Sequence, residues 1–516
     1  MEYPYISLEE SRKFGVFELF GLAFNIFKEN LSLSLPSLIS SGTQVLQSLI
    51  VVFALLYIVE TYPDLTAFED ILTGNITGSL LIPEALRLLA VIIKFFFIGV
   101  FITTVLRNLF YSAFLYPYAY RLLKGEKISF FKCWNESMIF IRKLVPAVLV
   151  VEGISTGIPI IVASLIIDKF LELARIGLIS NFEAGLKNEE VLILITAILA
   201  LLIVVAIFTV VAHFIFIFVY QIIIVEKLDL LSALAKSLIL ALKNFVNLII
   251  YGFLEITLLI IILLVSSIFQ LLHMEISEIL QFVLLTILSP IFSVVLLGIY
   301  LQATGIPIRY EPRREYSLTE VFLKKLNQGL SYLKNYLRFP NLKFIISTIA
   351  VYFLGFFLGL EYSKGPLGEL LSILLRPREA GFNIQNFPCF YAFSGIFAHN
   401  WLVSFLTAFS GILYFPLPLA NCLFNGVLVG TVFGLVSPFE FAVAVLPHGF
   451  IEIPSFIIAT SLGVKLGVYI LLDKEKAGVV SREVIYVLIG LAPFFLISAL
   501  IEALLTPLLL KFMGMM

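Results

Sequence analysis

Charged residues are scarce in this chain. Asp, Glu, Lys and Arg make up 13% of its 516 residues and hydrophobic residues 60%, whereas a soluble domain is about 25% charged. The composition therefore excludes an ordinary soluble protein. Apolar runs long enough to cross a bilayer recur along the sequence, and a helix satisfies its own backbone groups in lipid. We predict an all-α fold, a polytopic transmembrane helical bundle of about eleven spans with amphipathic interfacial helices, in the cell membrane.

Cysteine is also rare, and nucleotide-binding motifs are missing. Cys133, Cys389 and Cys422 form no CxxC pair, which excludes a disulfide framework or a cysteine-based zinc site. The chain contains no GxxxxGK[ST] or GxGxxG motif, so soluble nucleotide-binding machinery is excluded. The letters GxSxG occur at Gly153–Gly157, but inside an expected apolar span and not at a strand-to-helix turn, so they do not indicate a serine hydrolase. We therefore expect no cofactor, no bound metal and no nucleic-acid partner, and we favour a protein that is not an enzyme.

The loops between the expected spans differ in charge. Residues 121–143 carry six basic and two acidic residues, whereas 60–84 carry five carboxylates and no Lys or Arg. Basic loops remain in the cytoplasm, so we place 121–143, 306–340 and 465–483 there, and 60–84 and 361–388 outside. The spans are expected at about 33–59, 86–115, 144–167, 191–225, 245–271, 279–303, 342–360, 390–413, 417–436, 439–462 and 485–510.

The pattern divides the chain into three parts. Residues 1–305 form a six-span membrane domain, 306–340 a basic cytoplasmic linker helix, and 341–516 a five-span domain. The linker helix opens on the capping box Ser317-Leu318-Thr319-Glu320. Its basic residues suit either anionic lipid headgroups or a soluble protein partner. Within the first domain, three similar segments each precede a pair of spans, which indicates three hairpin repeats; these segments are 17–31, 130–145 and 230–246.

One stretch of the five-span domain concentrates intramembrane chemistry. His448 and Glu452 are four residues apart and share a helix face, and ionisable residues inside a span mark functional sites by default. Pro447, Gly449 and Pro454 surround them, which predicts a broken or kinked helix. The candidate buried polar site consists of Asn400, Asn421, Asn425, His448, Glu452 and Glu502.

Two interpretations of this polar site remain open. It could act as a proton relay or polar substrate site, or it could be structural, since hydrogen bonds between spans contribute about 0.6 to 2 kcal/mol. A metal site is not expected, because one histidine and two scattered carboxylates fall short of an HExxH motif. Gly426, Gly430 and Gly434 form a GxxxGxxxG ridge for close helix packing, either within the bundle or across a homodimer.

The second domain resembles the stage II sporulation protein M family over about residues 341–510. The resemblance rests on the ordered motifs His399-Asn400, Gly411, Asn425-Gly426 with Gly430, Pro447-His448-Gly449 with Glu452, Ala459, Gly463, Glu502 and Thr506-Pro507. It implies a five-span membrane protein, and for the sporulating member an anchor for partners that remodel cell-wall peptidoglycan. Residues 1–340 lie outside the family pattern, so the chain is interpreted as a fusion or an extended member.

Two functions follow as hypotheses. The first is a membrane scaffold or assembly factor that recruits partner proteins at the basic linker. The second is a transporter or permease with its polar site around His448 and Glu452, because broken helices and buried carboxylates are typical of transporters. A third and weaker hypothesis is an intramembrane hydrolase that uses the same two residues. A water-filled path to His448 would favour transport, and a fully hydrogen-bonded cluster would favour the scaffold.

Overall fold

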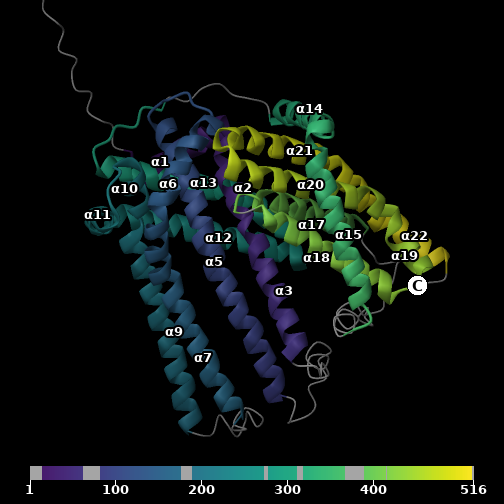
Figure 1. The fold of residues 1–516 in the computed structure, drawn as a ribbon. Coiled ribbons are helices and arrows are strands. Elements are labelled where there is room, and N and C mark those ends of the chain that lie inside the picture. Colours follow the sequence, from purple (N-terminus) through teal and green to yellow (C-terminus); the bar gives the residue numbers. More distant parts are fainter. Residues whose placement is uncertain are drawn as a thin grey trace, which may run out of the picture.

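The computed structural model describes residues 14–61, 82–175, 189–271, 277–310, 318–365, 389–413 and 415–513. These residues form helices and connecting loops, with no strand among them, which confirms the predicted all-α class (Figure 1). Nine of the described helical segments are long and apolar enough to cross a membrane. The two loops predicted to lie on the external side of the membrane, at 60–84 and 361–388, fall largely outside the described residues.

The N-terminal half consists of long apolar helices joined by short amphipathic ones. Its helices are α1 (Val16–Glu29), α2 (Leu35–Ser41), α3 (Thr43–Thr61), α5 (Ile82–Leu123), α6 (Phe130–Glu152), α7 (Ile158–Arg175), α9 (Glu189–Phe216), α10 (Val219–Val225), α11 (Leu230–Lys243), α12 (Phe245–Leu271) and α13 (Ser277–Ala303). The predicted interfacial segments 17–31 and 230–246 correspond to α1 and α11. The segment 130–145 does not form a separate helix, because α6 runs without a break from Phe130 to Glu152.

The C-terminal half begins with the linker helix α14 (Leu318–Tyr336), which starts where the capping box predicts. The other helices are α15 (Leu342–Tyr362), α17 (Cys389–Ser410), α18 (Pro416–Leu435), α19 (Pro438–Ala444), α20 (Leu446–Leu472), α21 (Lys474–Leu500) and α22 (Thr506–Phe512). The expected end of the span 439–462 and the expected start of the span 485–510 are wrong, since the segment 465–483 between them is not a loop. It contains the end of α20 and the start of α21.

Lys465 explains why that charged segment is helical. The residue is 8% exposed, and its ammonium donates to Asn341 Oδ1 at 2.8 Å and to Glu483 Oε2 at 2.5 Å. The ammonium also lies 5.3 Å from the centre of the Tyr336 ring. A lysine that has these hydrogen-bond and ion-pair partners can be buried where helices cross. A charged residue at this position therefore does not indicate a loop.

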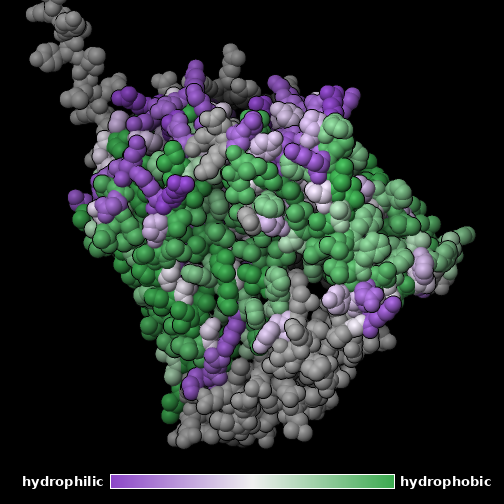
Figure 2. All heavy atoms as spheres, viewed as in Figure 1, coloured by the Kyte–Doolittle hydropathy of each residue, from purple (hydrophilic) through white to green (hydrophobic). Residues whose placement is uncertain are grey.

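Polar and charged residues gather at one end of the molecule, where α14 lies across the ends of the spans (Figures 1 and 2). We call this the basic end. Here Arg309 donates its backbone N–H to the Leu123 carbonyl at 2.8 Å, and Lys325 donates to the Tyr486 hydroxyl at 2.6 Å. Together with the contact between Lys465 and the Tyr336 ring, these bonds show that the three regions predicted to be cytoplasmic lie together. Their sidedness stays a prediction.

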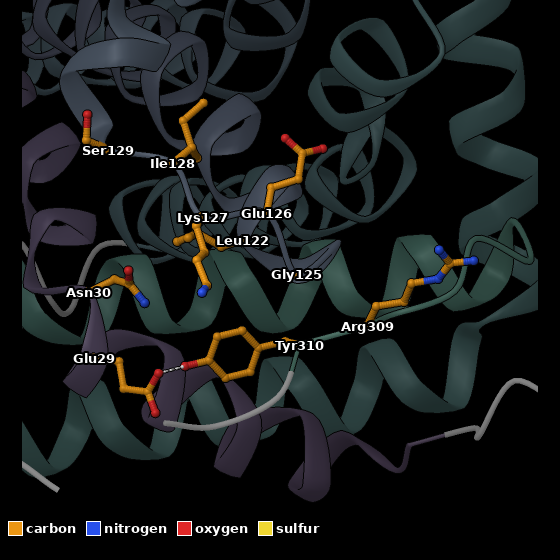
Figure 3. A pocket seen from close by; sticks show the side chains of 10 residues that line it. All are labelled: Glu29, Asn30, Leu122, Gly125, Glu126, Lys127, Ile128, Ser129, Arg309 and Tyr310. Atoms are coloured by element: carbon orange, nitrogen blue, oxygen red, sulfur yellow. Dashed lines mark hydrogen bonds between the residues drawn. The ribbon is translucent and has the colours of Figure 1, made fainter. Parts of the chain in front are cut away.

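The basic end also contains a pocket of about 420 Å³, formed where the α5–α6 loop meets the linker. Figure 3 shows Tyr310 reaching across to α1, where its hydroxyl donates to Glu29 Oε2 at 2.5 Å. Gly125 has a φ of +77°, and a Cβ there would lie 2.8 Å from the Arg309 carbonyl oxygen. Gly125 therefore lets the extended segment around Arg309 lie directly against the loop.

The two halves of the chain share one hydrophobic core. It includes Trp134 of α6, Phe409 of α17 and Phe495 of α21, all fully buried. A Cβ on Gly42, between α2 and α3, would lie 2.6 Å from the backbone of Phe409. The α7–α9 hairpin extends away from this core and presents apolar side chains (Figures 1 and 2), as expected for a surface in contact with lipid.

Candidate functional site

The break in the polypeptide lies just before His448. Helix α19 ends at Ala444, and α20 starts at Leu446 with Pro447 in its first turn, where a missing N–H costs nothing. Pro454 is accommodated inside α20 without ending it. The predicted interruption is therefore real, but it precedes the polar pair, and His448 and Glu452 project from one continuous helix as successive turns of the same face.

Glu502 joins this pair from the end of the chain. Helix α21 passes at Ile501 into a short π-helix (Ile501–Leu505), which leads into α22. Such π-turns frequently occur at functional sites. His448, Glu452 and Glu502 each offer one nitrogen or oxygen atom, and these atoms lie within 4.8 Å of one another. His448 Nε2 lies 4.0 Å from Glu502 Oε2. We call these three residues the His–Glu–Glu cluster.

A partly open cavity of about 100 Å³ lies beside the cluster and is lined by helices of the C-terminal half. Glu452 lines it and thereby connects the cavity to the cluster. Asn400 of α17 and Asn425 of α18 line it as well, and Asn400 interacts with the Glu452 side chain. The fold therefore gathers five of the six predicted polar residues into one region. The volume corresponds to roughly three waters at about 30 Å³ each.

Several polar atoms in this region lack a hydrogen-bond partner among the described residues. They include His448 Nδ1 and Glu452 Oε2 in the cluster, and the hydroxyls of Tyr352 and Ser404 in the cavity wall. Tyr352 is 4% exposed and Ser404 is fully buried. An unpaired buried polar group costs about 1 to 3 kcal/mol, so this grouping is poorly suited to hold helices together.

Asn421 is the one predicted residue that belongs elsewhere. It is 8% exposed, and its amide donates to Thr407 Oγ1 at 2.5 Å, between α18 and α17. The backbone carbonyl oxygen of Asn421 accepts a hydrogen bond from the Asn425 side-chain amide at 2.9 Å. Asn421 therefore has the structural role, a hydrogen bond between spans, that was one of the two interpretations of the polar residues.

The cavity wall also contains residues that the sequence analysis did not predict, namely Tyr352, Ser404 and His399. A signal for Ser404 was present, since Asn400, Ser404 and Thr407 are spaced as one polar stripe on a helix. Serine and threonine are common in apolar helices, where they usually bond to their own backbone, so the stripe was not distinctive. Nothing in the sequence connects Tyr352 of α15 to the site.

A second intramembrane carboxylate provides a contrast. Glu152 is 3% exposed and precedes the chain's other described π-helix, Gly153–Gly157. Its Oε1 accepts from Asn108 at 2.7 Å and from Tyr220 at 3.2 Å, and its Oε2 accepts from Thr156 at 2.9 Å. Both oxygens of Glu152 are satisfied, whereas Glu452 Oε2 is not. The fold can thus supply full partners to a buried carboxylate, and it does so at only one of these two positions.

The glycine ridge packs inside the bundle. A Cβ on Gly426 would lie 2.2 Å from the Tyr352 carbonyl oxygen, and one on Gly434 would lie 2.1 Å from the Ser363 hydroxyl. The opposing helix α15 contributes Gly355, whose Cβ would lie 2.2 Å from the Leu423 carbonyl oxygen. This ridge therefore joins α18 to α15 and fixes Tyr352 beside the cavity.

These features define a class, a multi-pass α-helical membrane protein with a polar site among its C-terminal helices. Residues 344–507 match the family model described as Stage II sporulation protein M, so the C-terminal region carries the domain of that family, and the predicted resemblance is confirmed. The match runs from the first turn of α15 to the first two residues of α22 and includes all six predicted polar residues. No curated protein and no solved structure matches the chain.

Proposed function

We propose that this protein is a transporter of the cell membrane whose C-terminal bundle binds a small polar solute or ion at the cavity beside Glu452. The observation that carries the proposal is the set of unpartnered polar atoms on Glu452, Tyr352 and Ser404. Lipid offers no hydrogen bonds, so these atoms gain their missing partners only from water or from a bound solute.

Two features of the backbone support the same function. The helix interruption at Val445 lies just before His448, and the π-helix Ile501–Leu505 contains Glu502. Transporters commonly bind substrates where spans are interrupted, because freed backbone groups and polar side chains meet there. No nucleotide-binding motif occurs in the chain, so uptake would be driven by an ion gradient or by a partner protein.

The direct test is water access to the cavity, which does not require the substrate to be known. Cysteine is placed at Asn425 or Ser404 after the native cysteines are replaced by serine, and a small membrane-impermeant thiol reagent is added from each side. Asn421→Cys is the matched control, since Asn421 lies on the same helix as Asn425 but is bonded between α17 and α18.

The transport proposal predicts faster labelling at 425 and 404 than at 421, from at least one side of the membrane. Equal and negligible labelling at all three positions would mean a dry cavity. That result would contradict transport and favour a purely structural bundle.

A second candidate function, recruitment of partner proteins as a scaffold, is favoured by α14. Its inner face packs on α21, where a Cβ on Gly329 would lie 2.7 Å from the Gly490 nitrogen. Its outer face keeps Leu323 and Leu330 exposed, and the exposed Leu337 follows directly after the helix, so the three leucines recur at seven-residue intervals. They lie beside the basic residues Lys324, Lys334 and Arg338 in the sequence. Seven residues make nearly two helical turns, so the leucines form one stripe.

The stripe could contact lipid headgroups or a protein. A photo-crosslinking residue at Leu330, compared with one at Leu333 on the buried face, distinguishes these occupants in intact cells. Recruitment predicts a discrete protein adduct at Leu330, lost when Lys324 and Lys334 are changed to Glu. Adducts with lipid alone would contradict the scaffold function.

A further inference from the structure

The His–Glu–Glu cluster has the chemistry of a metal site. Sequence reasoning set a metal aside because the carboxylates are scattered, and the fold corrects that premise by placing Glu502 against the His448–Glu452 pair. We infer that His448, Glu452 and Glu502 form a binding site for a divalent first-row transition metal ion, of which Zn²⁺ and Mn²⁺ are the test cases. This inference deepens the proposed function, because it names the class of ion taken by the same site.

The geometry is close to that of a three-ligand site. The donor atoms lie within 4.8 Å of one another, and the His448–Glu502 separation is 4.0 Å. In a tetrahedral zinc site, bonds of about 2.0 to 2.2 Å place the ligand atoms roughly 3.3 Å apart. Each donor therefore needs to move inward by about 1 Å or less, which side-chain rotation about flexible torsions can supply.

The charges also fit a divalent ion. Two ionised carboxylates and a neutral imidazole carry a total charge of −2, which one divalent cation neutralises. Among the described residues, no Lys or Arg forms an ion pair with Glu452 or Glu502. Lys465 lies on the same helix as Glu452 but is bonded to Glu483 at the basic end. Two unpaired carboxylates within a span are costly, and a bound cation removes that cost.

The surroundings provide the outer contacts that metal ligands require. Asn400 interacts with the Glu452 side chain. The Thr506 hydroxyl lies four residues after Glu502, is 7% exposed, and has no hydrogen-bond partner among the described residues. A hydrogen bond such as the one between Asn400 and Glu452 orients a metal-bound carboxylate and tunes its basicity. The Thr506 hydroxyl makes no such bond to a described residue and is free to make one. The fully buried Ser404 and the Tyr352 hydroxyl, both unpartnered, line the adjoining cavity.

The number and type of the ligands restrict which metal ions the site can bind. Three protein ligands leave a coordination position for water, the pattern of an open rather than a closed structural site. Imidazole favours Zn²⁺, Fe²⁺ and related ions over Mg²⁺ and Ca²⁺, which prefer oxygen ligands alone, and carboxylates extend the range to Mn²⁺. An open coordination position beside a cavity suits an ion that is bound and then released.

The experiment measures metal binding to the full-length protein in detergent. After treatment with a chelator, the protein is dialysed against Zn²⁺ or Mn²⁺ and the bound metal is counted by mass spectrometry. We expect about one equivalent for the wild type, and at least tenfold weaker binding for His448→Ala and for Glu502→Gln. The controls are His213→Ala and Glu255→Gln, another histidine and another carboxylate within spans of the other half, and they should bind like the wild type.

A measurement on the wild-type protein alone keeps the test valid even if the variants fail to fold. X-ray absorption at the zinc edge should show nitrogen and oxygen ligands including one imidazole, and no sulfur. Absence of bound metal, binding unchanged in both cluster variants, or a sulfur ligand would each overturn the site.

The two proposals can fail separately. Bound metal without water access to positions 404 and 425 would contradict transport and leave the metal site in place. Water access without bound metal would overturn the metal site and leave transport of another solute standing.

Discussion

Gly430 of α18 lies directly against the Phe356 carbonyl of α15. A Cβ at Gly430 would be 1.9 Å from that oxygen, and its partner on the opposite helix, Gly359, would place a Cβ 2.0 Å from the Val427 carbonyl oxygen. Atoms cannot approach so closely, so the two helices must separate if either glycine is replaced. This contact fixes the distance between α15 and α18, and with it one wall of the cavity.

Replacement of Gly430 by alanine should therefore destabilise the protein by about 1 to 3 kcal/mol or more, the range for overpacking a tight contact. Thermal unfolding in detergent measures the change. The control is Gly252→Ala in α12, where a Cβ would meet nothing within 4 Å and alanine should be neutral or stabilising by up to about 1 kcal/mol. Equal effects of both substitutions would contradict the close contact.

Lys465→Met should be among the most damaging changes at the basic end. It leaves the partly buried Glu483 without its counter-charge, and breaking a buried ion pair in this way costs about 3 to 5 kcal/mol. Lys476→Met is the comparison, because Lys476 is 67% exposed where it pairs with Asp473 and exposed pairs contribute about 0 to 1 kcal/mol. Denaturant-induced unfolding measures the loss of unfolding free energy in each variant. Equal losses in the two variants would contradict the buried ion pair.

Helix α11 should lose stability in acid through Asp229. The carboxylate caps α11 by accepting the Ser232 N–H at 3.3 Å, and hydrogen bonds from Ser232 hold the pKa of Asp229 below its usual value of 3.8. Because the folded-state pKa is depressed, this stabilisation is present above the unfolded-state pKa and is lost as pH falls through the folded-state value. The hydrogen-exchange protection factors of amides in the first turn of α11, which correct for the slower intrinsic exchange in acid, should therefore fall below about pH 4.

Asp229→Asn provides the control for that measurement. Asparagine also caps helices well but does not titrate, so its α11 exchange should lack the acid-dependent step. A step of equal size in both proteins would assign it to another group.

The division of the chain at the linker stays a prediction, and a fragment tests it. Residues 318–516 alone should insert and fold in detergent, because the tightest packing of the C-terminal half, between α15 and α18 and between α20 and α21, lies within the fragment. The fragment exposes apolar surface that α2, α3 and α6 normally cover, and detergent can cover it instead. Aggregation of the fragment under conditions where the full chain is stable would argue for one inseparable body.

Local patterns were sufficient to predict much of this structure. The helical class followed from apolar runs, α14 from its capping box, and the His448–Glu452 face from a spacing of four residues. Each of these depends on contacts within about one helical turn, which the sequence displays directly.

The remaining features depend on contacts between distant segments. Glu502 reaches His448 only because α21 packs against α20 and ends in a π-turn, and Tyr352 reaches the cavity only because α15 packs on the glycine ridge. Lys465 was placed in a loop because its partners, Asn341 and Glu483, are not visible from its neighbours in sequence. Asn421 was included in the predicted site for the same reason. It lies beside Asn425 on a helix face, and its bond to Thr407 of another helix is not visible from its neighbours in sequence.

The central claim is that Glu452 serves a bound solute or ion and not the packing of helices. Its most direct test compares thermal unfolding of Glu452→Gln and Glu152→Gln in detergent, both measured on metal-free protein. Glu152→Gln should be destabilised by about 1 to 3 kcal/mol. The glutamine side chain turns its own NH₂ group toward groups that donate to Glu152 in the wild type, so buried donors are left unpaired. Glu452→Gln should unfold at the wild-type temperature or above it, because Oε2 loses no partner and a buried charge is removed. Destabilisation of Glu452→Gln by as much as Glu152→Gln would contradict the account.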